Sequence, residues 1–134
     1  MAAKDANEKD KINSGIYSIQ EHHASHLHWD LRLEKDGVLK SWALPKQPTN
    51  DIGVRRLAIQ TEDHELSFAF FEGKIPEGNY GAGEIKVYDR GTYEPLDMDV
   101  SKYIIRINGT KLKGVFVLLK IKGDKDWLLF KKGE

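Results

Sequence analysis

Several features are missing from this 134-residue sequence. It has no cysteine, which excludes disulfide frameworks and thiolate zinc sites. No apolar run approaches the roughly 18 residues of a membrane-spanning helix, and residues 1–15 lack the apolar centre of a secretory signal. We therefore expect a cytoplasmic protein with no membrane association, and the absence of a long apolar strand that demands a partner favours a monomer.

The length fits one domain, which can bury a core without disulfides or a structural metal. Residues 1–13 are polar, charged and without periodicity, so we expect a flexible tail there and a single folded domain over residues 14–134.

The net charge is zero, but the charges are unevenly distributed. Residues 1–100 hold 12 Lys+Arg and 18 Asp+Glu, a balance of −6, whereas residues 101–134 hold 9 and 3, a balance of +6. A basic final segment fits a phosphate-facing patch and fits a solvated lysine surface equally well.

Apolar residues recur with a period of two, which predicts strands. We expect residues 22–34 to lie along one strand, followed by a hairpin turn at Asp36-Gly37 and a second strand over residues 38–44. Further strands are expected at 55–62, 66–73, 83–91, 92–98, 102–109, 114–123 and 126–132, and helical signal is weak. Many short strands with close turns predict an all-β fold, a compact closed or partly open β-barrel with at most one or two short helices.

Four of the five histidines fall within residues 22–28, and Asp30, Arg32 and Glu34 follow. On a regular strand, residues of even number share one face, so His28 and Asp30 are next-but-one neighbours. Imidazole and carboxylate together suit Mn²⁺, Fe²⁺ or Zn²⁺. His22 has the same parity and can supply a third ligand if the strand curves.

Arg32 offers only hydrogen-bond donors, so it suits phosphate oxygens beside the metal. His64 is a candidate acid, base or phosphate donor, with Glu62 on the same parity to orient it. His23 and His26 are interpreted as surface or supporting residues, and Trp29 and Trp42 as core aromatics because leucines flank them. The glycines of residues 74–91 favour a structural turn and bulge over a phosphate cradle.

These segments carry a family resemblance. The stretches HHASHLHWDLRLEKDGVLKSWALPKQP, TEDHELSFAFFEGKIPEGNYGAGEIKVYDRGTYEP and KLKGVFVLLKIKGDKDWLLFKK together resemble the 3′-phosphoesterase domain of bacterial and archaeal DNA ligase D, in a stand-alone version. The resemblance runs from about Tyr17 to Lys132.

The resemblance implies a β-barrel that uses a divalent metal, typically Mn²⁺ or otherwise Co²⁺ or Zn²⁺, on 3′ ends of a DNA primer-template. Such an enzyme removes a terminal ribonucleoside and then hydrolyses the remaining 3′-phosphate to a 3′-hydroxyl, in repair or end joining with a separate DNA ligase and polymerase as partners. By position in the motif, His22, His28 and Asp30 match metal ligands, and Arg32 and His64 match phosphate-contacting catalytic residues. Supporting polar positions are matched by Gln20, Lys46 and Glu62.

The sequence departs from the family pattern at two places. Phe68 stands where many bacterial members have a tyrosine, and Tyr80 is a candidate to replace the lost hydroxyl. The acidic and arginine residues that longer members carry before the first strand are not recognisable in residues 1–15.

Two other hypotheses remain open. One is a non-enzymatic nucleic-acid-binding barrel. The other is an iron oxygenase, because His28, Asp30 and His64 also provide two imidazoles and one carboxylate.

Overall fold

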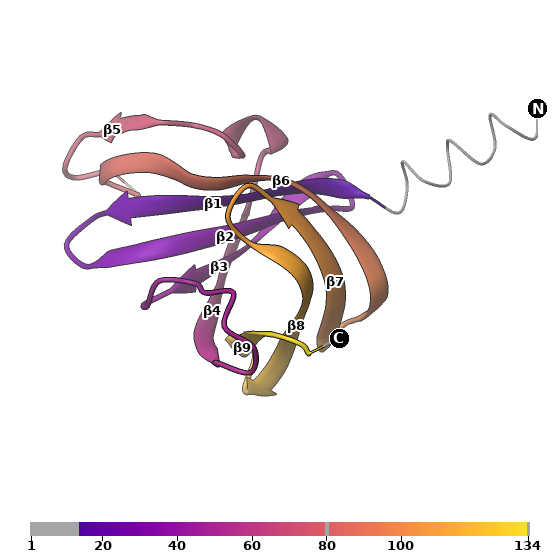
Figure 1. Ribbon diagram of the computed structural model, residues 1–134. Helices are drawn as coiled ribbons and strands as arrows, with labels where there is room; N and C mark the ends of the chain where they lie inside the picture. Colours follow the sequence, from indigo (N-terminus) through magenta and orange to yellow (C-terminus); the bar gives the residue numbers. More distant parts are fainter. Residues whose placement is uncertain (1–13, 80, 134) are drawn as a thin grey trace, which may run out of the picture.

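The computed structural model describes residues 14–79 and 81–133 (Figure 1). The expected flexible tail, residues 1–13, lies outside them. Nine strands and one 3₁₀ turn account for the regular structure: β1 (Gly15–His23), β2 (Leu27–Lys35), β3 (Val38–Leu44), β4 (Arg56–His64), η1 (Leu66–Phe68), β5 (Gly73–Ile75), β6 (Gly83–Asp99), β7 (Lys102–Gly109), β8 (Lys113–Lys122) and β9 (Asp126–Lys131). Within the described ranges there is no α-helix, nor any helix long and apolar enough to cross a membrane.

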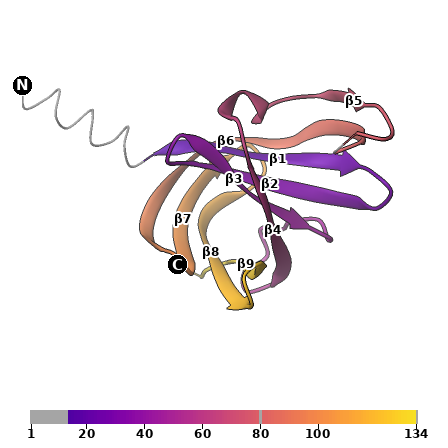
Figure 2. The same cartoon turned by 180° about the vertical axis from the view of Figure 1, so that it is seen from behind.

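The strands form a closed antiparallel barrel. Eight of them follow one another in the order β1-β2-β3-β4-β9-β8-β7-β6, and pairing of β6 with β1 closes the ring. Among the described residues, the ninth strand, β5, pairs with β6 alone and lies outside the ring, as the two opposite views show (Figures 1 and 2). The predicted all-β barrel is therefore confirmed.

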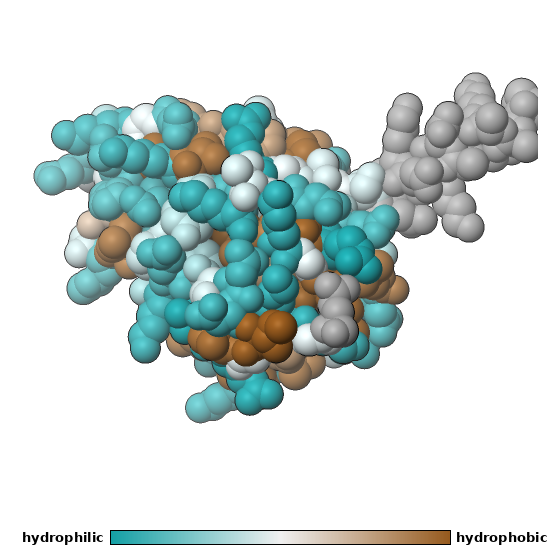
Figure 3. Space-filling view, in the orientation of Figure 1, coloured by the Kyte–Doolittle hydropathy of each residue, from teal (hydrophilic) through white to brown (hydrophobic). Residues whose placement is uncertain are grey.

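The core lies on the inner face of the barrel. Alternation along each strand points one set of apolar residues inward. Within this core, the rings of Trp42, Tyr103 and Trp127 meet edge to face, with each pair of ring centroids 5.6 Å apart. Trp29 and Trp42 are both buried, which confirms their predicted place in the core. Over much of the outer surface seen in Figure 3, hydrophilic residues predominate and the hydrophobic patches are small.

The hairpin between β2 and β3 forms where it was predicted. Asp36 and Gly37 occupy its turn with φ values of 55° and 81°, the left-handed region that two-residue hairpin turns require. The prediction of a single strand over residues 22–34 was wrong. The chain turns back at residues 24–26, so β1 and β2 are a second hairpin in which His22 pairs directly with His28.

The predicted strand at residues 66–73 was also wrong. The chain instead forms η1 and a short irregular stretch before β5, and we call residues 65–75 the arm. The carbonyl oxygens of Phe68 and Phe71 accept hydrogen bonds of 2.9 and 3.1 Å from the Gln20 side-chain amide. Because a side chain satisfies these carbonyls, the segment needs no strand partner there. These contacts, together with that between Arg32 of β2 and the Phe68 ring, hold the arm against the outer face of β1 and β2.

The two strands expected at 83–91 and 92–98 are one strand, β6, which has 17 residues. It changes pairing partner along its length, with register shifts opposite Ile19/Gln20 and between Pro95 and Asp97. These irregularities let one strand bend around the barrel.

Asp89, on β6, fastens one end of the barrel. Its buried carboxylate accepts hydrogen bonds of 2.8 Å from the Tyr17 hydroxyl and from the backbone N–H groups of Thr110, Lys111 and Leu112. A Cβ at Gly109 would lie 2.4 Å from the Asp89 carboxylate, so glycine is required for this close approach.

Candidate active site

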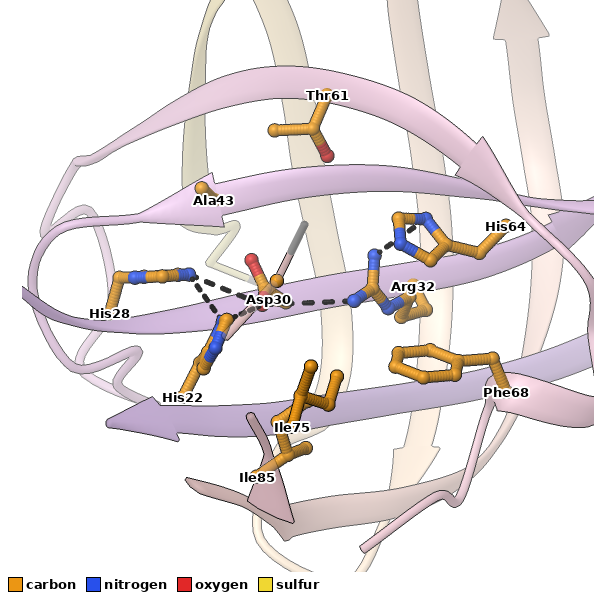
Figure 4. Close-up of a pocket in the computed structure, with 11 residues that line it drawn as sticks. His22, His28, Asp30, Arg32, Ala43, Thr61, His64, Phe68, Ile75 and Ile85 are labelled. Carbon is orange, nitrogen blue, oxygen red and sulfur yellow. Dashed lines mark hydrogen bonds and ion pairs between the residues drawn. The ribbon is translucent and has the colours of Figure 1, made fainter. Parts of the chain in front are cut away.

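A pocket of about 400 Å³ opens on the outer face of the barrel, between the strands and the arm (Figure 4). Its floor comes from the outward-facing side chains of β1 and β2, the same strands whose alternate residues fill the core. The lining residues are His22, His28, Asp30, Arg32, Ala43, Thr61, His64, Phe68, Ile75, Gly81 and Ile85.

Three potential metal ligands converge in this pocket. The distance from His22 Nδ1 to His28 Nε2 is 3.1 Å, and Asp30 Oδ2 lies 3.4 Å from the first nitrogen and 3.3 Å from the second. Within the described part of the chain, these residues form the one group of three or more ligand side chains close enough to share an ion. The hairpin between β1 and β2 brings them together.

Hydrogen bonds fix how the two imidazoles face each other. His22 Nε2 donates to the Ala82 carbonyl oxygen at 2.9 Å, and His28 Nδ1 donates to the His26 carbonyl oxygen at 3.0 Å. A neutral imidazole carries one hydrogen, so His22 Nδ1 and His28 Nε2 present lone pairs to each other. Two lone pairs this close repel unless a cation or a proton lies between them.

The donor set fits a divalent metal ion. Metal–ligand bonds in such sites are about 2.0–2.2 Å long, and the ligand–metal–ligand angles lie between octahedral and tetrahedral values. Two ligand atoms on the same ion are then roughly 3.0–3.5 Å apart. The three observed separations, 3.1, 3.3 and 3.4 Å, all fall in this range. Two nitrogens and one carboxylate oxygen suit Mn²⁺, Co²⁺ or Zn²⁺, and the backbone carbonyls behind the histidines provide the orienting contacts typical of metal sites.

Electrostatics of the group match this geometry. In the protonated ring, His28 Nε2–H donates to Asp30, and this hydrogen bond raises the pKa of His28 against the smaller opposing effect of burial. Burial alone would raise the pKa of Asp30, but the hydrogen bond from His28 and the positive charge of Arg32 outweigh it and lower that pKa. Asp30 is therefore an anion at neutral pH.

Arg32 is buried beside the three ligands. Its Nε donates to Gln20 Oε1 at 2.9 Å, and its Nη2 lies 3.7 Å from Asp30 Oδ2. Its guanidinium also lies 5.2 Å from the centroid of the Phe68 ring. Gln20, which holds the arm through its amide nitrogen, thus holds Arg32 through its amide oxygen.

His64 lies on the far side of Arg32 from the ligand group (Figure 4). Its Nδ1 is 2.9 Å from the Glu62 carbonyl oxygen and 3.1 Å from Arg32 Nη1. Burial, followed by the Arg32 charge, lowers the pKa of His64. The iron-type triad of His28, Asp30 and His64 is not assembled, since Arg32 separates His64 from the carboxylate and His22 completes the group instead.

The other predicted site residues lie around or away from the pocket. Gln20 is fully buried behind Arg32. Glu62 contacts His64 through its backbone carbonyl, and its side chain is exposed. Lys46 follows the end of β3 with an exposed side chain and is not among the lining residues. His23 and His26 are exposed, and the proposed substitute hydroxyl of Tyr80 lies outside the described residues.

A β-bulge explains why parity misplaced Glu62. Leu39 pairs with His64 and Ser41 with Thr61, so three steps on β4 face two steps on β3. His64 and Thr61 therefore both face the pocket, although their numbers differ in parity. The sequence analysis missed Thr61, Ala43, Ile75 and Ile85, which have no distinguishing motif; only the bulge and the arm bring them to the site.

Comparison with known proteins gives a consistent match. Residues 20–120 match the family model described as the DNA ligase D 3′-phosphoesterase domain. The chain is 46% identical over 131 residues to the multifunctional non-homologous end joining protein LigD of Pseudomonas aeruginosa, covering 92% of this chain. It is 46% identical over 120 residues to the Mycobacterium tuberculosis LigD and 42% identical over 127 residues to that of Mycolicibacterium smegmatis, each covering 87% of this chain. In all three, the match spans 16% of the relative's length.

Proposed function

Because this chain belongs to the DNA ligase D 3′-phosphoesterase family, we propose that it is a metal-dependent hydrolase that heals 3′ ends of DNA. It removes a terminal ribonucleoside by breaking the bond between phosphorus and that nucleoside's 5′ oxygen, which leaves a 3′-phosphate. It then breaks the bond between phosphorus and the 3′ oxygen of the strand, which leaves a 3′-hydroxyl. The names of the relatives, which include non-homologous end joining, support a role in that repair process, and a separate DNA ligase and polymerase are the partners we propose.

The observation that carries the proposal is the pair of opposed imidazole lone pairs beside a buried carboxylate and a buried arginine. His22, His28 and Asp30 would hold the divalent ion, Mn²⁺ or otherwise Co²⁺ or Zn²⁺. When bound, such an ion acts as a Lewis acid that stabilises negative charge on the phosphate oxygens.

Arg32 binds the phosphate next to this ion. Its Nη2 lies 3.7 Å from Asp30, so a phosphate held by its guanidinium is adjacent to the ligand group. Gln20 fixes the guanidinium from behind through Nε. A fixed, buried arginine loses little freedom when the phosphate binds and stabilises charge that develops at phosphorus.

His64 supplies a proton. Burial and Arg32 lower its pKa, so the free ring is neutral at pH 7. A bound phosphate adds negative charge beside the ring, which raises its pKa and lets the imidazolium protonate the departing oxygen. Phe68 stacks beside this ring, with the two centroids 5.2 Å apart.

The test is a gel assay of a 5′-labelled primer-template that ends in one ribonucleotide, with Mn²⁺ present. The wild type should convert the primer to the 3′-phosphate and then to the 3′-hydroxyl. His28→Ala and His64→Ala should each lose at least about 100-fold in rate, whereas His23→Ala, an exposed histidine paired with Glu21, should not. A primer left unchanged by the wild type with every divalent metal would contradict the proposal and favour simple DNA binding.

A further inference from the structure

We propose that the outer face of β4, β9 and β8 is a docking surface for a protein that presents an apolar patch inside an acidic rim, and that this protein is the DNA ligase that joins the healed end. Figures 1 and 2 show β8 and β9 on the side of the molecule opposite β5. Six outward-facing side chains define this docking face, and none of them lines the pocket: Leu57, Val117, Leu119, Ile121, Leu128 and Phe130.

The two strands β8 and β9 have the sequence of strands that are covered on both faces. Residues 115–119 are apolar at five successive positions and residues 127–130 at four. By contrast, β2 alternates apolar and polar residues, as expected of an antiparallel strand with one solvated face. Alternate residues of β8 and β9, such as Leu118 and Leu129, belong to the core. The apolar residues between them therefore point outward.

These outward side chains are neighbours across the strands. Leu57 pairs with Leu128 and Leu128 with Leu119, which gives a row of three leucines across β4, β9 and β8. In the adjacent row, a valine of β8 pairs with a phenylalanine of β9. Leu57 is 41% exposed and Ile121 is 48% exposed. A contiguous apolar surface left open to solvent in this way marks an interaction site.

The basic final segment of the sequence belongs to this side of the barrel and not to the pocket. All described residues that line the pocket fall within residues 22–85. Residues 101–134, with their balance of +6, therefore contribute none of them. Instead they form β7, β8 and β9, which carry or border the docking face.

Cationic side chains border the docking face. Arg55, just before β4, places its guanidinium 5.2 Å from the centroid of the Phe130 ring. Lys102 lies on β7 beside the leucine row, and Lys122 ends β8 with an exposed side chain. Asp126 is opposite Lys122 in the register, which leaves this border net positive. An apolar centre with a charged rim has the anatomy of a protein–protein interface.

The charge of the rim selects among the possible occupants. A second copy of the chain would bring two cationic rims together, and like charges across an interface disfavour association. The DNA backbone would pair with the cations but would leave the leucine row without an apolar contact. A protein surface with an apolar centre and an acidic rim complements both features.

Resting on the proposed function, the ligase is the occupant for two reasons. The matched family is described as a domain of DNA ligase D, and the match spans 16% of the Pseudomonas aeruginosa relative, so in that protein the barrel belongs to a much longer chain. The 3′-hydroxyl that this chain leaves is also the group that a ligase joins. Docking outside the pocket leaves the pocket open and raises the effective concentration of the ligase at the healed end.

The experiment measures the Kd of the full chain for the separate DNA ligase of the same organism by isothermal titration calorimetry. The polymerase of that organism and a primer-template without protein are the parallel probes. Leu57→Asp and Ile121→Asp each place a charge on the docking face at an exposed position. Val100→Asp is the matched control, because Val100 is 90% exposed and lies in the turn between β6 and β7. Sedimentation of the chain alone reports self-association, and a primer with a 3′-phosphate reports activity.

Leu57→Asp and Ile121→Asp should each weaken ligase binding by at least about 10-fold, whereas Val100→Asp should bind as the wild type does. Added salt should weaken the wild-type complex, and all three variants should keep wild-type activity on the 3′-phosphate. The inference is overturned if the wild type does not bind the ligase or if Val100→Asp weakens binding equally. It is also overturned if the two face variants instead abolish self-association or binding of DNA or the polymerase. A wild type inactive on the primer would contradict the proposed function itself.

Discussion

At the scale of single residues, two histidines of the pocket lie in opposite electrostatic surroundings. His28 faces the Asp30 carboxylate, which raises its pKa, whereas burial and Arg32 lower the pKa of His64. In the protein kept metal-free with a chelator, we expect His28 to titrate above the ordinary value of about 6.5 and His64 below it. Side-chain NMR of the two rings across pH 4–9 measures this, and titration of both rings on the same side of that value would contradict it.

The two shifts act on stability in opposite directions. The native-state pKa of His28 is raised, so its contribution is present below about pH 6.5 and is lost as pH rises through the native pKa. The native-state pKa of His64 is lowered, so protonation below about pH 6.5 favours the unfolded state and stability falls as pH decreases toward the native pKa. In His64→Ala, the free energy of unfolding should therefore fall less between pH 7 and pH 5 than it does in the wild type. Urea unfolding at the two pH values measures this difference.

At the scale of structural elements, Gln20 connects β1 to the arm and to Arg32. Gln20→Met keeps the size of the side chain but leaves the carbonyls of Phe68 and Phe71 and the Nε of Arg32 without this partner. We expect the free energy of unfolding to fall by about 2–4 kcal/mol and amide exchange in the arm to accelerate. Gln47→Met, an exposed glutamine bonded to the Tyr88 hydroxyl, is the matched control. Unchanged exchange at Phe68, Ala69 and Phe71 would show that Gln20 does not hold the arm.

Asp89 joins β6 to the turn after β7. In the native protein, both carboxylate oxygens of Asp89 accept hydrogen bonds from backbone N–H groups. Asp89→Asn replaces one of these oxygens with an NH₂ group, which cannot accept and so faces backbone donors without bonding to them. Chemical denaturation should show a loss of about 3 kcal/mol, while Mn²⁺ affinity is retained because neither Asp89 nor the turn lines the pocket. Asp97→Asn, which affects an exposed ion pair with Lys102, should change stability by less than about 0.5 kcal/mol. Equal losses of stability in Asp89→Asn and Asp97→Asn would argue against a special role of Asp89 in holding β6 to the turn after β7.

The sequence correctly predicted elements whose conformation depends on adjacent residues, and it failed where the conformation depends on residues far apart in the chain. The Asp36-Gly37 turn was found correctly because its left-handed backbone depends on two residues alone. The arm was mistaken for a strand because its aromatic residues have a strand-like composition, and the group that frees it from strand pairing, Gln20, is 48 residues away from Phe68. Likewise, parity placed Arg32 and Asp30 together on β2, but the bulge between β3 and β4 defeated the same argument for Glu62.

At the scale of the whole molecule, the ligand group joins β1 to β2 and so couples metal binding to the barrel. An ion that binds only the folded protein stabilises it by about 2.7 kcal/mol at 100 times its Kd. We expect Mn²⁺ to raise the Tm of the wild type by several degrees, and to leave that of Asp30→Asn nearly unchanged. Differential scanning calorimetry with and without a chelator tests this; an equal rise in both proteins would place the ion elsewhere.

Along β1 and β2, odd-numbered residues face the core and even-numbered residues face the pocket side. Tyr17, Ile19, Leu31 and Leu33 belong to the core, while His22, Asp30 and Arg32 line the pocket and Gln20 lies behind Arg32. A substitution at one position therefore acts mainly on folding, and one at the next position acts mainly on the chemistry of the pocket. The barrel can in this way acquire new specificity through every second position without rebuilding its interior, which makes the outer face of these two strands a natural starting point for directed evolution.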